Sequence, residues 1–171
     1  MKINSVFLTF PIFETKLKIT SQYEKFVKSR KLNQFELHSN NYEKENEELT
    51  LKTEYLLNDF LIAVCKQLNF NKYRFKTTWI QKYKELEFHD CHVHNPKAFS
   101  IILYVDCTKD SAETMFYNPG YPYFDIFRHK ISPEKGKVVV FHGGLPHAAL
   151  PNKDKKRIVV SGNIDFFNEK A

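Results

Sequence analysis

The sequence predicts a mainly β fold, an antiparallel sandwich or barrel with a helical cover at its N-terminal side. Turn-forming pieces such as NPGYP and SPEKG separate short segments rich in β-branched and aromatic residues, and this spacing is typical of all-β sandwiches and barrels. The strand-like segments after residue 70 are 75–83 (FKTTWIQKY), 99–105 (FSIILYV), 137–141 (KVVVF) and 157–164 (RIVVSGNI).

One strong helix signal precedes these strands. Apolar residues of the segment 54–70 recur at helical spacing and form one face, which we expect to pack on the sheet: Leu56, Leu57, Phe60, Leu61, Val64, Cys65 and Leu68. A shorter helix is expected to start at Ser21, because Ser21 and Glu24 form a capping-box pattern. Residues 40–48 are polar and acidic, and we expect them to form a loop.

The whole chain, residues 1–171, is expected to form a single domain, because no linker, repeat or biased segment divides it. Residues 1–72 would supply an N-terminal strand and the helical cover, and residues 73–171 the β core. The N-terminal strand is expected at 5–13, where Pro11 indicates a sheet edge or a strand end.

The charge balance is mildly basic. A net charge of +6, from 26 basic and 20 acidic residues, is compatible with an anionic small molecule or an acidic partner, and it does not by itself indicate nucleic acid. The basic run KDKKR at 153–157 is interpreted as a solvated turn.

The sequence offers no sign of a membrane span or of secretion. No apolar stretch reaches the roughly 18–20 residues of a transmembrane helix, and the N-terminus lacks the pattern of a signal peptide. Cys65, Cys91 and Cys107 are an odd number without CxxC spacing, which argues against a disulfide framework. We therefore expect a cytoplasmic protein, in the host cytoplasm if it is viral, without a membrane partner.

Four polar side chains with metal-binding potential cluster before the strand 99–105. In a regular strand, Asp90, His92 and His94 would share one face, and His89 would point away. His147, shortly after the strand 137–141, is the leading candidate for a third ligand. Imidazoles suit Fe, Zn, Cu and Ni, and two His with a carboxylate suit non-haem Fe(II). A histidine-rich polar loop without a metal remains an equal alternative at this point.

An arginine begins the last strand-like segment. A regular strand would place Arg157, Val159 and Ser161 on one face, and an inward arginine would need an anion. The alternative is that Arg157 ends the surface turn. Tyr104 lies within an apolar run, so its hydroxyl needs a buried partner, which is either a ligand or the backbone. Tyr83 is a weaker candidate to line the same site.

The ordered set of motifs resembles a known family. The block HVHNPKAFSIILYV holds His92, His94, Ser100 and Tyr104, MFYNP follows at 115–119, GKVVVFHGGLPH ends at His147, and RIVVSGN contributes Arg157, Ser161 and Asn163. In this order the motifs resemble those of the Fe(II)/2-oxoglutarate-dependent oxygenases, in particular the small prolyl-hydroxylase-like oxygenases of phages and marine bacteria. The resemblance spans roughly 75–165.

This resemblance implies a fold and a chemistry. It implies a double-stranded β-helix, or jelly-roll, core with flanking helices. It also implies Fe(II) held by His92, His147 and a third ligand, and 2-oxoglutarate whose far carboxylate pairs with Arg157, helped by Tyr104 and Ser161. The activity implied is that of a dioxygenase that consumes dioxygen and 2-oxoglutarate and hydroxylates an unidentified substrate, such as a prolyl or other protein residue or a metabolite.

The sequence departs from the wider superfamily at one ligand position. His94 stands where an Asp or Glu is usual, and we expect it to be the third ligand. Asp90 is the alternative third ligand, or it orients a ligand imidazole, and a water could also complete the set. Asn163 is a further candidate to support the site. The aromatic loop 115–127 would form a lid or would pack on the core.

Two rival functions remain open. One is a non-catalytic jelly-roll binding or structural protein, such as a viral accessory protein. The other is a cupin-like metalloenzyme that does not use 2-oxoglutarate, in which Arg157 would not face the metal.

Overall fold

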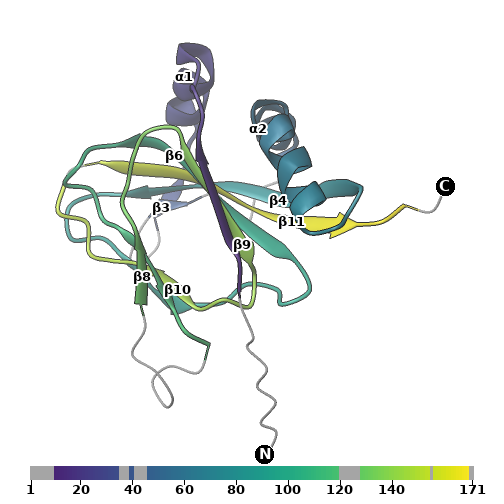
Figure 1. Ribbon diagram of the computed structural model, residues 1–171. Coiled ribbons are helices and arrows are strands. Elements are labelled where there is room, and N and C mark those ends of the chain that lie inside the picture. Colours follow the sequence, from purple (N-terminus) through teal and green to yellow (C-terminus); the bar gives the residue numbers. More distant parts are fainter. Residues whose placement is uncertain (1–9, 35–38, 41–45, 120–127, 155, 170–171) are drawn as a thin grey trace, which may run out of the picture.

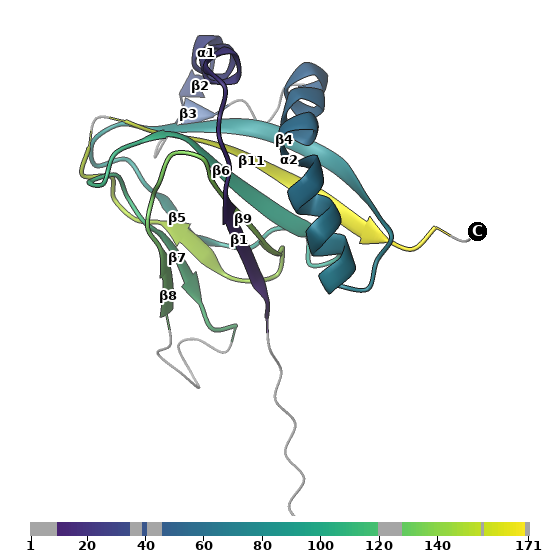
Figure 2. The same cartoon turned by 45° about the horizontal axis from the view of Figure 1, so that its top comes forward.

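The structure, a computed structural model, describes residues 10–34, 39–40, 46–119, 128–154 and 156–169. Among these residues the strands form two antiparallel sheets that face each other, and both helices cover the outer side of the larger sheet (Figures 1 and 2). The mainly β fold class predicted from the sequence is confirmed.

The larger sheet has seven described strands in the order β1-β9-β6-β11-β4-β3-β2. Their bounds are β1 Ile12–Lys16, β2 Asn33–Gln34, β3 Ser39–Asn40, β4 Lys72–Tyr83, β6 Phe99–Cys107, β9 Lys137–His142 and β11 Arg157–Phe167. The four strands predicted after residue 70 are all present, and each is longer than predicted, because pairing with neighbours extends it past the residues with a strong β preference.

The smaller sheet has the described order β5-β10-β7-β8. Its strands are only three or four residues long: β5 His89–His92, β7 Thr114–Tyr117, β8 Arg128–Ile131 and β10 His147–Ala149. They are too short to show a periodic pattern in the sequence, and they were not predicted individually.

The first helix, α1 (Ser21–Ser29), begins where it was predicted, but a different residue caps it. Thr20 is the N-cap, and its hydroxyl accepts a hydrogen bond from the backbone N–H of Tyr23 at 3.1 Å. With Thr20 as the N-cap, Glu24 lies one residue past the capping-box position, and its carboxylate pairs with Lys28 and Lys135.

The second helix, α2 (Glu47–Gln67), starts earlier than predicted and ends earlier. Its buried face continues N-terminally through Leu49 and Thr53, and the Thr53 hydroxyl donates to the carbonyl of Leu49 at 2.7 Å. It ends because Asn69 takes a left-handed conformation (φ 60°) and the N–H of Phe70 turns back to the carbonyl of Cys65 at 2.9 Å. Its apolar face packs on the larger sheet, as predicted.

The N-terminal strand lies later than predicted. β1 starts directly after Pro11 and, among the described strands, pairs only with β9, so it forms the sheet edge that the proline indicated. Residues 5–9 of the predicted strand lie outside the described residues. The loop predicted at 40–48 is wrong at both ends, because Asn40 belongs to β3 and Glu47 to α2, while 41–45 are not described.

Alternating side chains of the larger sheet build two separate cores. On β6, Leu103 and Val105 pack toward the helices, whereas Ile102 and Tyr104 point between the two sheets. The inner core lies between the two sheets, so its residues border any site that the sheets enclose.

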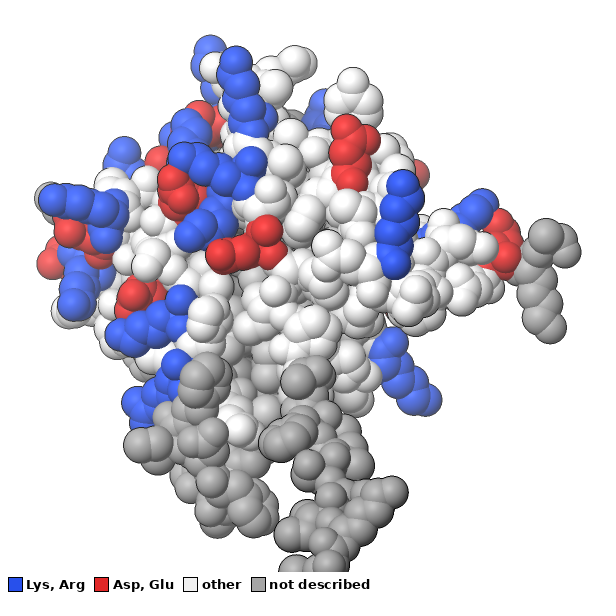
Figure 3. Space-filling view, viewed as in Figure 1, with Lys and Arg blue, Asp and Glu red and all other residues white. Residues whose placement is uncertain are grey.

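Charges on the surface are mixed in sign. On the face seen in Figure 3, Lys and Arg gather near α1 with Asp and Glu among them, and Lys28 contacts both Glu24 and Asp106. Lys153 and Lys156 of the KDKKR turn are exposed, and Lys155 is not described. Neither described helix has the length and apolar character that a membrane span requires.

Candidate metal centre and anion pocket

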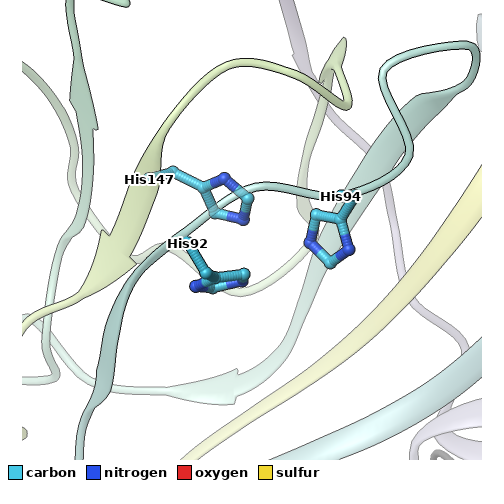
Figure 4. Close-up of side chains that lie close together, drawn as sticks. All are labelled: His92, His94 and His147. Atoms are coloured by element: carbon cyan, nitrogen blue, oxygen red, sulfur yellow. The ribbon is translucent and has the colours of Figure 1, made fainter.

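Three imidazoles meet between the sheets. His92 ends β5, His147 begins β10 directly opposite it, and His94 lies two residues beyond β5. One ring nitrogen from each lies within 4.8 Å of the others, and Figure 4 shows the three rings turned toward a common space. The geometry of this cluster suits a single metal ion.

Backbone carbonyls fix the orientation of two of these rings. Nδ1 of His92 lies 2.6 Å from the carbonyl oxygen of Asp90, and Nδ1 of His147 lies 3.0 Å from that of Leu145. A carbonyl only accepts, so each Nδ1 carries the proton and donates it. Nε2 of both rings is then left with a lone pair, as a metal ligand requires.

His94 is held by a close approach of two loops. Its backbone N–H donates to the carbonyl of Gly143 at 2.7 Å, and the N–H of Gly143 donates to the carbonyl of Ala98 at 2.8 Å. A Cβ at Gly143 would lie 2.4 Å from the carbonyl oxygen of Asn95. The loop after β9 therefore needs glycine here in order to position the loop that carries His94.

The cluster favours neutral imidazoles. Burial lowers the pKa of His92, and burial together with repulsion from His92 lowers the pKa of His94 to about 4. Burial, together with repulsion from His92, lowers the pKa of His147 well below its usual value. All three rings are unprotonated near pH 7 and can offer lone pairs to a cation.

A β-bulge overturns the expected side-chain parity of β5. His92 pairs with His147, but the next pair toward the chain start is His89 with Ala149, so β5 has one extra residue. The bulge turns His89 into the site, where its ring stacks on His92 with centroids 3.9 Å apart. The side chain of Asp90 is exposed, and its backbone carbonyl accepts a hydrogen bond from the ring of His92.

A short polar chain links this fourth histidine to β11. Ser161 Oγ donates to Oε1 of Gln81 at 2.9 Å, and Nε2 of Gln81 donates to Nδ1 of His89 at 3.1 Å. Ser161 thus lines the site, and its hydroxyl is bonded to the side chain of Gln81.

A buried arginine lies in the same cavity. Arg157 is 1% exposed, and its Nη2 donates to Oγ1 of Thr114 at 2.9 Å. Thr114 also bonds the hydroxyl of Tyr104 at 2.6 Å. The guanidinium lies over the rings of Tyr83 and Tyr104, with its central carbon 4.6 and 5.4 Å from their centroids, and burial raises the pKa of Tyr83.

Two donors of this guanidinium have no partner among the residues that the structure describes. Nε and Nη1 of Arg157 are buried and form no hydrogen bond, and no carboxylate among the described residues pairs with Arg157. A buried cation without a counter-ion is costly, so the site is built for an anion.

The imidazoles and the guanidinium share one cavity. Its lining includes Gln81, Tyr83, His89, His92, His94, Thr114, His147, Arg157, Val159 and Ser161. Asn163 lies outside it and bonds Ser100 and Thr77. Of the aromatic loop 115–127, Met115, Phe116 and Tyr117 belong to β7, and residues 120–127 are not described.

Sequence reasoning missed Thr114 and Gln81. The parity of β4 places Gln81 on the face of Tyr83 and could have revealed it. Thr114 lacks any such signal, because its partners lie 10 and 43 residues away in the chain.

Comparisons with solved structures recognise this architecture. A prolyl-4-hydroxylase from Pseudomonas putida superposes with a TM-score of 0.65 at 15% identity, covering 95% of both chains. The viral collagen prolyl hydroxylase of Paramecium bursaria Chlorella virus-1, in its 2-oxoglutarate complex, gives 0.62 at 16% identity over 92% of this chain and 96% of that one. This chain has the double-stranded β-helix fold of the 2-oxoglutarate oxygenases.

A further structure with this fold is HygX from Streptomyces hygroscopicus with nickel, 2-oxoglutarate and hygromycin B bound. It gives a TM-score of 0.69 at 10% identity, over 95% of this chain and 86% of that one. By sequence, no protein-family model matches this chain, and no curated protein is significantly similar to it. The jelly-roll fold that the motif resemblance implied is confirmed, and the chemistry of the site is argued from its residues.

Proposed function

We propose that this chain is an Fe(II)- and 2-oxoglutarate-dependent oxygenase that hydroxylates a residue of a polypeptide. The observation that carries this proposal is the shared cavity, in which three neutral imidazoles face a buried guanidinium with two unpaired donors. A metal site alone or an arginine alone would fit many functions. Together they match what a metal-chelating dicarboxylate requires.

The imidazoles of His92, His94 and His147 would hold the metal. Three protein ligands leave further coordination positions open for small ligands, as a catalytic non-haem site requires. When bound, Fe(II) would supply the site at which dioxygen is reduced, with two electrons from 2-oxoglutarate as it becomes succinate and CO₂ and two from the substrate as its C–H bond becomes C–OH. The protein's part is to orient the ligand rings, to exclude water and to position the substrate.

Arg157 would bind the far carboxylate of 2-oxoglutarate. A guanidinium matches a carboxylate in bidentate geometry and stays charged when buried. Thr114 takes one N–H of Nη2, while Nε and Nη1 have no partner among the described residues, so the guanidinium keeps free N–H groups to receive the anion. A cupin-like enzyme without 2-oxoglutarate gives no reason for an unpaired arginine in the metal cavity, so this arrangement favours the oxygenase over that rival.

The structures that share the fold support a polypeptide substrate. They include prolyl hydroxylases, one of them in complex with a peptide fragment of hypoxia-inducible factor. The 2-oxoglutarate complexes among them support the proposed co-substrate.

Succinate formation tests the proposal. Full-length protein loaded anaerobically with Fe(II) is given 2-oxoglutarate and dioxygen, and NMR follows succinate, while metal analysis reports bound iron. We expect slow turnover by the wild type even without prime substrate. His147→Ala should lose both iron and turnover. Arg157→Gln should keep iron but need at least about tenfold more 2-oxoglutarate, since one lost charged contact is worth about 1.5–3 kcal/mol.

Two further variants make the result interpretable. Arg157→Lys keeps the charge without the bidentate geometry, and it separates loss of binding from loss of fold. Arg128→Gln, on exposed β8, is the matched arginine control and should behave as wild type. Wild-type protein that holds iron but forms no succinate under any of these conditions would contradict the proposal.

A further inference from the structure

A second hollow lies beyond the imidazole cluster, where β4 begins and β11 ends. The start of β4 and the end of β11 pair with each other and form a two-stranded ribbon, which extends past the rest of the larger sheet toward the C-terminus (Figure 1). The hollow, here called the ribbon groove, has a volume of about 1120 Å³ including the part open to solvent, and its lining includes Arg74, Lys76, Lys97, Asn163, Asp165 and Phe167.

The ribbon groove continues the face that carries the proposed active site. Along β11, Arg157, Val159 and Ser161 line the cavity, and Asn163 and Asp165, which follow with the same parity, line the groove. On the other wall, Asn95 lines the groove one residue after His94. A chain lying in the groove would therefore run directly past the imidazole cluster.

The groove has an excess of positive charge. It contains three cations and one carboxylate, and Asp165 already pairs with Lys76 at 2.9 Å and with Arg74 at 3.6 Å. No described carboxylate lies within ion-pair distance of Lys97. An anionic ligand is therefore favoured over a neutral or cationic one.

The walls of the groove are fixed by side-chain contacts and offer hydrogen-bonding groups. Nδ2 of Asn163 donates to Oγ1 of Thr77 at 3.1 Å. The guanidinium of Arg74 lies 5.7 Å over the ring of Phe167. Amide and hydroxyl groups between charges suit the backbone of an extended polypeptide.

We propose that the ribbon groove binds an acidic polypeptide segment next to the residue that is modified at the imidazole cluster. The reaction in this proposal rests on the proposed function, whereas the binding does not. A polypeptide is favoured over a nucleic acid because Arg74 already covers the ring of Phe167 on which a base would stack.

Fluorescence anisotropy with the metal-free full chain tests the groove without any turnover. The labelled probes are the peptides (Glu-Ala-Pro)4, (Gln-Ala-Pro)4 and (Lys-Ala-Pro)4 and the oligonucleotide dT12. We expect the Glu peptide to bind at least about tenfold tighter than the Gln peptide, with the preference falling as salt rises. The same preference should hold in His147→Ala, so failure of the metal chemistry would leave this result unchanged.

Charge reversal locates the binding site. Lys97→Glu combined with Arg74→Glu should weaken binding of the Glu peptide at least about tenfold. Lys82→Glu, an exposed lysine of β4 outside the groove, should stay within about twofold. Lys97→Gln alone should give an intermediate loss, which guards against misfolding of the double variant. Equal binding of the Glu and Gln peptides, tighter binding of dT12, no binding of any probe, or indifference to the groove variants would each overturn the proposal.

Discussion

His92 and His147 lie directly opposite each other on β5 and β10, with ring centroids 4.3 Å apart. Strand pairing, and not loop conformation, sets this distance. The two rings therefore stay together without a metal. Their proximity makes the stability of the metal-free protein depend on pH.

The metal-free protein should lose stability as the pH falls from about 6.5 toward 4. The pKa of His94 is about 4 in the folded state and near 6.5 in the unfolded chain, so the unfolded chain binds more protons across this window. Each such proton lowers the free energy of unfolding by up to about 1.4 kcal/mol per pH unit. Urea denaturation at several pH values measures the slope.

The matched variants for this slope are two histidine replacements. His94→Gln should reduce the slope of the free energy of unfolding against pH by up to the contribution of one proton, about 1.4 kcal/mol per pH unit. His129→Gln, at an exposed position of β8, should leave this slope unchanged. A wild-type stability that stays constant between pH 7 and 5 would show that the cluster is not buried as described.

His94→Asp should change the metal preference of the site. Three imidazoles leave a divalent ion with its full charge and suit Ni(II) and Cu(II), whereas a carboxylate favours harder ions such as Mn(II). We expect the ratio of Mn(II) to Ni(II) affinity to rise at least about tenfold, measured by competition with a chromogenic chelator. Asp90→Asn should change both affinities less than about twofold, because the Asp90 side chain is exposed. A large loss in Asp90→Asn would instead make Asp90 a ligand.

Thr114→Val should destabilise the protein by about 1–3 kcal/mol although the side chains have nearly the same shape. The threonine hydroxyl is the partner of both Arg157 Nη2 and the Tyr104 hydroxyl, and both would be left buried without it. Chemical denaturation measures the loss. Thr15→Val on the edge strand β1 is the control, with an expected change below about 0.5 kcal/mol. Equal effects of the two substitutions would rule out this role of Thr114.

Gly143→Ala should weaken metal binding although Gly143 is not one of the proposed metal ligands. The new Cβ would meet backbone oxygens of Asn95 and Ala98, which cannot move without displacing His94. We expect a loss of stability of about 1–3 kcal/mol together with weaker Ni(II) binding by calorimetry. Gly144→Ala is the matched neighbour, where the contact is with the movable ring of His142 at 3.2 Å, and a smaller effect is expected. Unchanged Ni(II) binding in Gly143→Ala would contradict this account of the loop.

The alternation of side chains predicted for a regular strand is found on β11 and not on β5, because β5 carries a β-bulge. β11 keeps its alternation, since the irregularity in its pairing with β6 falls on β6, so Arg157 and Ser161 share a face as expected. On β5 an extra residue between His89 and His92 reverses the face of His89. The bulge depends on pairing with β10, a three-residue strand without a sequence signal of its own.

The fold was more accessible from the sequence than the anion pocket. Long β-rich segments and one amphipathic helix are local patterns, and they predicted the sheets and α2. The partners of Arg157 come from β7, β6 and β4, and only the folded chain brings Thr114, Tyr104 and Tyr83 around one guanidinium.

The most direct test of the central claim is a crystal structure of the full chain soaked anaerobically with Mn(II) and 2-oxoglutarate. We expect an anomalous peak for manganese between His92, His94 and His147, and a ligand carboxylate hydrogen-bonded to the guanidinium of Arg157. Manganese bound elsewhere, or a fully ordered metal site with no carboxylate at Arg157, would contradict the claim.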